Sequence, residues 1–344
     1  MNIKYHNPAN NILLETSNTY DAIKLLNDAI IKLILIVDID NKLVGTITDG
    51  DIRRSLIQSN DLNIASTVIM NAEPRFVKKS NENTLDSMIS KYNLPVILTD
   101  NENRVLNICT YETEDIVEKH TNLTLIMAGG RGERLMPLTS NTPKPMLPVH
   151  NKPIIHRIID NSKSHGFTNI SISVNYKSEQ LIDFFKDGND FGVAINYIHE
   201  NEPLGTAGAL SLLNFKNLNE PVIVINGDIL TSVNLSQLLD FHNNSGKDIT
   251  MCAANYNVAV PYGTIQVDGT TITDIIEKPL KSYLINAGIY VINPNIIKKM
   301  KPNVKIDMTT LIGQYVSDRN VSIYPLHESW IDIGSPEDYE KAQK

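Results

Sequence analysis

Residues 125–153 read "LIMAGGRGERLMPLTSNTPKPMLPVHNKP", in which three glycines follow an apolar run directly. Gly129, Gly130 and Gly132 lack the Cβ atom that would hinder a sharp turn and a close approach of the backbone to a ligand. A concave run of bare amides binds an anion without needing net positive charge. The spacing therefore predicts an anion-binding loop immediately after a strand.

Two familiar phosphate-binding patterns do not fit this loop. The glycines run G-G-x-G, which is not the dinucleotide fingerprint, and no G-K-[ST] follows, which excludes a Walker loop. Arg134 and Lys144 lie ten residues apart, and prolines at 137, 143, 145 and 148 stiffen the loop between and beyond them. Long loops without secondary structure of their own are usually functional. We therefore expect both cations to act on the same anion as the glycines.

From residue 123 onward, short apolar strands alternate with amphipathic helices. The expected strands are 123–127, 169–174, 194–198 and 221–225, and the expected helices are 153–166, 178–188 and 205–213. A hairpin is expected at Asp268-Gly269 and a last helix from Ser335. This alternation predicts an α/β fold, a Rossmann-like, mixed but mostly parallel wound sheet that binds ligands at the carboxyl ends of its strands.

Composition limits the classes of partner and compartment. The chain has 344 residues, which favours two domains, and a formal net charge of -8, which disfavours nucleic acid as a partner. No apolar run is long enough to span a membrane, and the first residues lack the layout of an export signal. We expect a cytoplasmic protein without membrane contact. The two cysteines, Cys109 and Cys252, are spaced for neither a disulfide framework nor a zinc site.

Residues 7–56 and 71–120 repeat one order: a helix, a strand, a polar turn and a second strand. This tandem α/β unit resembles a pair of CBS motifs, and the resemblance implies a regulatory domain over 1–120, ahead of a second domain over 121–344. In "GTITDGDI", Thr48 and Asp51 match the spacing with which such motifs hold an adenine nucleotide. The interval from Thr110 to Asp115 is two residues longer, so a second nucleotide site is in doubt. The alternative is that the pair only dimerises the chain; a homo-oligomer is expected in either case.

Residues 125–153 resemble the signature of the sugar-1-phosphate nucleotidyltransferases, AGGxGxRLxPLTxxxPKPMLPVxxKP, and further motifs follow in the family's order. The resemblance implies that the partners are a nucleoside triphosphate and a sugar 1-phosphate, which react to an NDP-sugar and pyrophosphate. It also implies a Mg²⁺ ion, since hard phosphate and carboxylate oxygens favour that ion. "VIVINGDI" ends an apolar strand with Asp228, and "SWIDIGSPEDY" contains Asp332; these are the implied metal ligands.

The same resemblance assigns the other roles. The implied nucleotide-binding residues are Ala128, Gly129, Gly130, Gly132, Arg134, Gly205 and Thr206, with Glu200 beside the base. The implied catalytic residues are Arg134, Lys144, Asp228 and Lys278. The implied sugar-phosphate residues are Gly227, Glu277, Lys278, Asn286 and Gly288.

The substrates are less sharply indicated. The segments "PKPMLPV", "LGTAGAL" and "NAGIYV" look most like those of mannose-1-phosphate guanylyltransferases. The arrangement with a CBS pair in front resembles instead the glucosamine-1-phosphate guanylyltransferases of bacterial legionaminic acid synthesis. We therefore expect GTP and glucosamine 1-phosphate, with mannose, glucose or heptose 1-phosphate as alternatives. A glycosyltransferase is disfavoured because Asp228 is followed by Ile229 and Leu230 instead of forming Asp-x-Asp. A non-catalytic nucleotide sensor is the alternative of another class.

Overall fold

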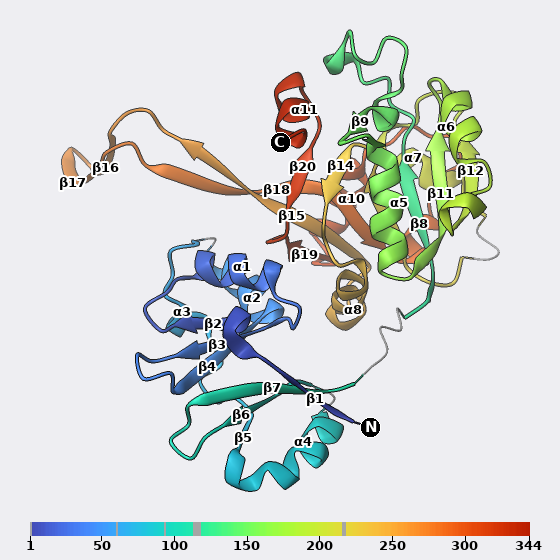
Figure 1. Ribbon diagram of the computed structural model, residues 1–344. Coiled ribbons are helices and arrows are strands. Elements are labelled where there is room, and N and C mark those ends of the chain that lie inside the picture. Colours follow the sequence, from blue (N-terminus) through green and yellow to red (C-terminus); the bar gives the residue numbers. More distant parts are fainter. Residues whose placement is uncertain (1, 60, 93, 113–117, 215–217) are drawn as a thin grey trace. The chain divides into compact units, whose positions relative to one another are not determined.

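The computed structural model describes residues 2–59, 61–92, 94–112, 118–214 and 218–344 (Figure 1). These residues form two compact units. The first unit comprises Met1–Ile116 and Asn255–Leu284, and the second comprises Val117–Ala254 and Ile285–Lys344. The division at residue 120 stays a proposal, because the segment Asn255–Leu284 groups with the N-terminal residues.

The first unit contains the same arrangement of strands twice. In each copy a short strand pairs in parallel with the middle strand, which pairs antiparallel with the third strand across one register shift. The first copy consists of β2 (Ile12–Leu14), α1 (Thr19–Asp28), β3 (Leu33–Val37) and β4 (Leu43–Thr48). The second copy consists of β5 (Phe76–Lys78), α4 (Leu85–Tyr92), β6 (Val96–Thr99) and β7 (Val105–Tyr111). The predicted repeat is thus present in the fold.

The polar turns of the two copies are also equivalent. Asp38 Oδ1 accepts hydrogen bonds from the amides two and four residues later, at 2.9 and 2.8 Å. Asp100 Oδ1 accepts the corresponding pair, both at 2.8 Å. Asn41 and Asn103 occupy the left-handed region in the same place, with φ of 62° and 66°. Short polar side chains favour this turn because they bond their own backbone.

The remaining elements of the first unit are short. They are β1 (Ile3–His6), which pairs with β7, η1 (Pro8–Asn11), α2 (Asp49–Gln58), α3 (Ser66–Ile69), η2 (Lys79–Thr84), β16 (Thr264–Asp268) and β17 (Thr271–Ile276). β16 and β17 form the expected hairpin, whose two loop residues are Gly269 and Thr270, one position later than the predicted Asp-Gly pair.

The second unit is built on a seven-stranded sheet with the order β12-β11-β8-β13-β18-β15-β19. The strands are β8 (His120–Met127), β11 (Phe167–Val174), β12 (Ala194–His199), β13 (Val222–Asn226), β15 (Ile249–Ala259), β18 (Leu280–Ile292) and β19 (Val321–Pro325). β12, β11, β8 and β13 are mutually parallel, as are β15 and β19, whereas β18 runs antiparallel to β13. The expected mixed, mostly parallel wound sheet is confirmed.

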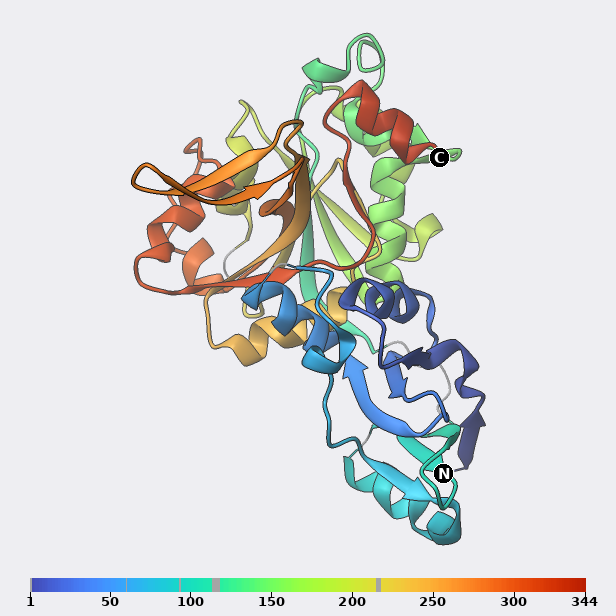
Figure 2. The ribbon, with the colours of Figure 1, turned by 90° about the vertical axis from the view of Figure 1, so that its left-hand side faces the viewer.

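Helices cover both faces of this sheet, and Figure 2 shows the sheet between α5 (green) and α10 (orange-red). Alternate residues of a strand enter opposite cores, so that Leu125 packs on one side and Ile126 on the other. The helical elements are η3 (Glu133–Leu135), η4 (Lys144–Met146), α5 (Ile154–Ser164), α6 (Ser178–Phe185), η5 (Asn189–Phe191), α7 (Gly205–Gly208), η6 (Ala209–Leu212), α8 (Leu235–Ser245), α9 (Pro294–Ile297), α10 (Met308–Val316) and α11 (Pro336–Ala342). Two-stranded ribbons complete the unit: β9 (Pro148–Val149) with β10 (Lys152–Pro153), and β14 (Ile229–Thr231) with β20 (Trp330–Asp332).

Local sequence explains some of the helix boundaries. α5 ends at Ser164, and Gly166 follows with φ +84°, as expected of a glycine cap. Ser335 begins α11 with a complete capping box. The predicted helix over 205–213 is wrong as a regular helix: one four-residue turn passes into a 3₁₀ turn, because two glycines weaken helix formation there. None of the helices in the described ranges has both the length and the apolar character needed to cross a membrane.

Candidate active site

The glycine loop leaves the sheet directly after β8. Gly132 has φ +64°, and a Cβ built on it would lie 2.9 Å from Lys144 Cβ, so a larger residue there would be strained and would displace the lysine. A Cβ built on Gly129 would lie 3.0 Å from Glu200 Oε1. Nothing lies within 4 Å of a Cβ built on Gly130. Gly132 and Gly129 therefore serve the fold of the loop, whereas Gly130 borders open space.

The two predicted metal ligands are brought together by a two-stranded ribbon. β14 follows Asp228 directly and pairs antiparallel with β20, so that Ile229 is the register partner of Asp332. The amide of Ile333 donates to the carbonyl of Asp228 at 3.1 Å. Two carboxylates that are remote in sequence thus lie next to one another beyond the carboxyl end of β13, the edge at which wound sheets bind ligands.

The environment of Asp332 reflects this proximity. Its side chain is reached by solvent, yet protein atoms crowd the carboxylate, and burial together with the charge of Asp228 raises the pKa of Asp332 above its usual value. Lys144 and Arg134 oppose that effect. A carboxylate that is costly to ionise beside a second carboxylate is well suited to a cation, which would relieve the repulsion.

Lys144 forms an ion pair with one of these two carboxylates, that of Asp228. It lies in η4 between two prolines, and its Nζ is 2.5 Å from Asp228 Oδ2. The lysine side chain is 11% exposed and the aspartate side chain 27% exposed, so this ion pair is largely shielded from water. A shielded pair is held more firmly than a surface pair, and the ammonium group is therefore fixed at the carboxylate site.

Arg134 reaches this place from the glycine loop. A Cβ built on Gly334 would lie 3.8 Å from both Arg134 Nη1 and Asp332 Oδ1. Gly334 follows β20 by two residues and leaves room for the guanidinium group. Arg134, Lys144, Asp228 and Asp332 therefore converge, as the sequence predicted.

A cleft runs along the glycine loop in two adjoining parts. One part has a volume of about 560 Å³ and the other about 240 Å³, and both are lined by Gly129, Gly130, Pro203 and Asp228. The larger part also contains Arg131, Gly132, Glu133, Arg134, Leu135, Lys144 and Gly334. The smaller part also contains Met127, Glu200, Gly205, Thr206 and Asn226. We call them the charged chamber and the small chamber.

Several lining residues were not predicted. Arg131 and Glu133 alternate with the glycines, so their place in the loop was the available signal. Gly334 lies two residues beyond Asp332, and a glycine so close to a predicted ligand was a second signal. Asn226 ends β13 immediately before the Gly-Asp pair, but nothing in its sequence context separates it from a residue of the strand.

Glu200 is held in place from behind the small chamber. Its Oε1 accepts a hydrogen bond from the hydroxyl of Ser173, and its Oε2 accepts one from the amide of Leu204 at 2.8 Å. Asn175 Nδ2 donates to the carbonyl of Glu200 at 2.6 Å. The residue is only 8% exposed. The carboxylate is thus a fixed acceptor at the wall of the chamber.

Some predicted binding residues have their amides engaged within the protein. The amide of Ala128 donates to the carbonyl of Ser173 at 3.0 Å, and that of Gly227 donates to the carbonyl of Met127 at 2.9 Å. The amide of Gly288 donates to Asn286 Oδ1 at 3.0 Å, with φ +71° at the glycine. In the part of the chain that is described, these three residues position the loop and β18 rather than line the two chambers.

Four predicted site residues belong to the first unit. Glu277 and Lys278 follow β17, and their role in binding the sugar phosphate stays a prediction. Thr48 and Asp51 do meet, but as the capping box of α2: the Thr48 amide and hydroxyl donate to Asp51 Oδ2 at 2.8 and 2.6 Å. Asp115 lies outside the described residues.

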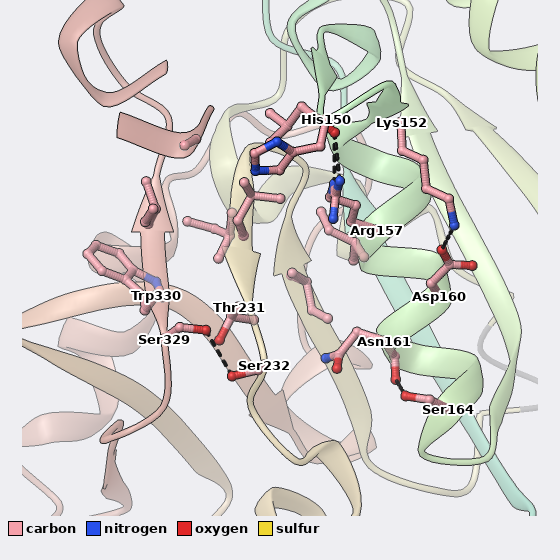
Figure 3. A pocket seen from close by; sticks show the side chains of 17 residues that line it. His150, Lys152, Arg157, Asp160, Asn161, Ser164, Thr231, Ser232, Ser329 and Trp330 are labelled. Atoms are coloured by element: carbon pink, nitrogen blue, oxygen red, sulfur yellow. Dashed lines mark hydrogen bonds and ion pairs between the residues drawn. The ribbon is translucent and has the colours of Figure 1, made fainter. Parts of the chain in front are cut away.

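A larger cavity lies elsewhere in the second unit, between α5, β14 and β20 (Figure 3). Its volume is about 680 Å³. The polar groups at its rim pair with one another: Lys152 with Asp160 at 2.8 Å and Ser232 with Ser329 at 2.9 Å (Figure 3). Arg157 donates to the carbonyl of Val149 at 2.7 Å. Size alone therefore does not single out a candidate active site, whereas the convergence of charged groups on the glycine loop does.

Residues 123–344 match the sequence profile described as "Nucleotidyl transferase". The chain belongs to the nucleotidyl transferase family. Residues 12–58 match the CBS domain profile, which supports the interpretation of the first repeat.

Relatives within the family share about a third of the aligned residues. The chain is 34% identical over 224 residues to "Probable mannose-1-phosphate guanylyltransferase 3" of Oryza sativa subsp. japonica, covering 62% of this chain and 62% of that protein. It is 36% identical over 225 residues to "Mannose-1-phosphate guanyltransferase" of Debaryomyces hansenii, with the same two shares of 62%. The chain thus spans less than two thirds of the length of these relatives.

Solved structures with a similar fold cover 64% of this chain. One is a putative glucose-1-phosphate thymidylyltransferase of Bacillus anthracis in complex with a sucrose, with a TM-score of 0.53, 25% identity and 94% of that chain covered. Another is HddC from Yersinia pseudotuberculosis complexed with GMP-PN, with a TM-score of 0.51, 28% identity and 98% of that chain covered.

Proposed function

We propose that this member of the family transfers a nucleoside monophosphate from a nucleoside triphosphate to a sugar 1-phosphate, releasing pyrophosphate. The observation that carries the proposal is the meeting of Asp228 and Asp332 through the β14–β20 ribbon, opposite the glycine loop with Arg134 and Lys144. A phosphate transfer of this kind needs alignment and charge neutralisation more than a nucleophilic side chain.

The charge balance of the site explains why a divalent ion is needed. In the charged chamber and at the neighbouring Asp332, the positively charged side chains are Arg131, Arg134 and Lys144, and the negatively charged ones are Glu133, Asp228 and Asp332. Their formal charges cancel, so a triphosphate would remain without neutralisation. A magnesium ion held by the two aspartates would supply that missing charge and a Lewis acid.

The reacting bonds assign roles to the protein groups. An oxygen of the sugar 1-phosphate attacks the α-phosphorus, the bond from that phosphorus to the bridging oxygen breaks, and pyrophosphate leaves. We propose that Lys144, which is paired with Asp228, holds the α-phosphate. Arg134 and the amides of the glycine loop are proposed to bind the leaving pyrophosphate, where charge develops. Glu277 and Lys278 are proposed to bind the sugar phosphate.

For the nucleotide we propose GTP, and for the acceptor a hexose 1-phosphate. The names of the curated relatives support guanylyl transfer and favour mannose 1-phosphate. The preceding CBS repeat was the reason to expect glucosamine 1-phosphate, and no relative named above supports that sugar or a role in legionaminic acid synthesis. Mannose 1-phosphate is therefore the first acceptor to test and glucosamine 1-phosphate the second.

The direct test is pyrophosphate release by the full chain with Mg²⁺. GTP, ATP, UTP, CTP and dTTP are each combined with mannose, glucosamine and glucose 1-phosphates. We expect the fastest release with GTP and one hexose 1-phosphate, and a loss of about 100-fold or more in Asp228→Asn. Absence of release with every pair, or release that survives Asp228→Asn, would rule the proposal out.

For the first unit we propose a regulatory role through adenine nucleotide binding and self-association. Calorimetric titration of the full chain with AMP and ATP tests the first part, and light scattering after gel filtration tests the second. Binding is expected to weaken in Asp51→Asn, although the capping box of α2 will weaken as well. A monomeric chain that binds neither nucleotide would refute both parts.

A further inference from the structure

The loop that carries Gly205 and Thr206 is clamped from behind by a segment from the C-terminal third of the chain. The amide of Ile306 donates to the carbonyl of Leu204 at 2.9 Å, and the amide of Ala207 donates to the carbonyl of Ile306 at 3.0 Å. Two stretches about a hundred residues apart thus share a pair of backbone hydrogen bonds in opposite directions.

Side chains reinforce this contact by exchanging helix caps. Asp307 is the N-cap residue of α10, yet its side chain does not cap that helix. Its Oδ1 accepts a hydrogen bond from the amide of Thr206 at 3.2 Å, in the first turn of α7. In return the hydroxyl of Thr206 accepts from the amide of Met308 at 2.8 Å, in the first turn of α10. Each residue satisfies a free donor of the other helix.

The close packing explains the glycine at the centre of the loop. Gly205 has φ +78°, and a Cβ built on it would lie 2.7 Å from Asp307 Oδ1 and 2.7 Å from the carbonyl oxygen of Ile306. Gly205 and Thr206 form part of the wall of the small chamber. The position of that wall is therefore set by the segment behind it.

We propose that Asp307 is a positioning residue for nucleotide binding, fixing the Gly205–Ala207 backbone at the small chamber. This inference rests on the proposed function of the cleft. Because the Thr206 oxygen already accepts from Met308, its own proton is available to donate to an oxygen of the ligand. Asp307 acts through the loop and does not itself touch the reacting atoms.

The variants Asp307→Ala and Asp307→Asn separate positioning from charge, because an Asn oxygen can still accept from the Thr206 amide. Asp318→Ala, which removes an exposed carboxylate just beyond α10, is the matched control. Two quantities are measured on the full chain: the KM and kcat for GTP, and amide hydrogen exchange over residues 204–208.

In Asp307→Ala we expect KM for GTP to rise about fivefold to tenfold with kcat changed less than about twofold, and exchange at 204–208 to accelerate. Asp307→Asn and Asp318→Ala should stay close to wild type in both. A lower melting temperature with unchanged KM, or an effect that Asn does not rescue, overturns the inference. If wild type releases no pyrophosphate, the proposed function fails; the exchange experiment then still decides whether Asp307 holds the loop, and unchanged exchange overturns that part too.

Discussion

Arg134 and Lys144 illustrate what single residues contribute to this site. Both cations come from one loop, yet Lys144 is buried against Asp228, whereas Arg134 faces the space beside Gly334 and Asp332. The lysine is paired with one carboxylate, whereas the arginine is exposed and has more freedom to move. Their substitutions should therefore have different consequences.

Removing the guanidinium group of Arg134 should weaken the transition state more than the fold. In Arg134→Ala we expect kcat/KM to fall by a factor that corresponds to a loss of about 2–4 kcal/mol in transition-state stabilisation, as is found when other catalytic hydrogen-bond donors are removed. The melting temperature should stay within about 2 °C of wild type, because Arg134 is exposed and its guanidinium group forms no hydrogen bond or ion pair within the described residues. Steady-state kinetics with thermal unfolding measures both.

The exposed cation Lys298 provides the control for charge alone. Lys298→Ala should keep wild-type kcat/KM. An equal loss in both variants would mean that the effect comes from net charge and not from the position of Arg134.

Asp332→Asn should stabilise the metal-free protein while it removes activity. Burial and the charge of Asp228 raise the pKa of Asp332 in the folded state. Ionisation of Asp332 is therefore less favourable in the folded than in the unfolded chain, so this residue costs stability once pH rises above its unfolded pKa of about 3.9. The neutral amide avoids that cost.

Thermal unfolding at pH 7 in a chelator checks this prediction: the melting temperature of Asp332→Asn should lie above that of wild type. Added Mg²⁺ should raise the melting temperature of wild type more than that of Asp332→Asn. A variant that melts below wild type without metal would contradict the account of the carboxylate pair.

At the scale of residues, sequence reasoning found the charged groups of the site but not those that hold them. Arg134, Lys144, Asp228 and Asp332 stand in motifs whose chemistry is readable one residue at a time. Asp307 could not be found in this way, because its importance comes from a contact with Thr206 across the fold. Ala128 and Gly227 were assigned to ligands although their amides are bonded within the protein.

The glycine loop is the element in which local geometry and ligand binding can be separated. Gly132 has positive φ and no room for a Cβ, whereas Gly130 borders open space. Gly132→Ala should lower the free energy of unfolding by about 1–3 kcal/mol, because of backbone strain and displacement of Lys144. Gly130→Ala should leave stability within about 0.5 kcal/mol of wild type but raise KM for the triphosphate.

Denaturant unfolding measures the free energy of unfolding of Gly132→Ala and Gly130→Ala, and steady-state kinetics measures their KM for the triphosphate. If Gly130→Ala binds the triphosphate as well as wild type, the phosphates do not lie over this part of the loop.

α8 is fastened to the sheet by a buried histidine. His242 Nδ1 lies 2.8 Å from Thr250 Oγ1, and Nε2 lies 3.0 Å from Asn293 Oδ1. The neutral ring satisfies both partners by donating from Nε2, and burial lowers its pKa. His242→Ala should cost about 2–4 kcal/mol, since it leaves a cavity and unpaired polar groups.

The contribution of His242 to the free energy of unfolding should depend on pH. A histidine whose folded pKa is lowered stabilises the protein fully above its unfolded pKa of about 6.5, and this stabilisation declines as pH falls below that value. Unfolding measured from pH 8 to pH 5 should show the difference between wild type and His242→Ala shrinking with acidity. A constant difference between wild type and His242→Ala over this pH range would contradict a neutral buried ring.

Among the elements, the central strands β8 and β13 were predictable because most of their residues are buried on both faces of the sheet and form nearly continuous apolar runs. The segment 205–213 was not, since its shape depends on Ile306 and Asp307 as much as on its own residues. The same reason applies to the ribbon of β14 and β20: both strands are too short to carry a pattern, and their pairing is a property of the folded chain.

The whole molecule combines a duplicated α/β unit with a wound sheet. The sequence indicated both, because a repeat and an alternation of strands and helices are visible along the chain without any contact being known. It could not indicate that residues 255–284 group with the N-terminal residues, because that grouping depends on contacts between distant segments. The choice of substrate could not be predicted either, because it depends on the positions of a small number of polar groups in the folded chain. Glu200 and Asn226, which line the small chamber, are the candidates for such groups.

A crystal structure of the full chain, from crystals soaked with GTP and Mg²⁺, decides whether the cleft at the glycine loop binds the nucleotide and the metal. We expect the β- and γ-phosphates against the amides of residues 129–132 and Arg134, the base in the small chamber near Glu200, and the metal between Asp228 and Asp332. GTP bound in another cavity, with the two aspartates uninvolved in metal binding, would contradict the account.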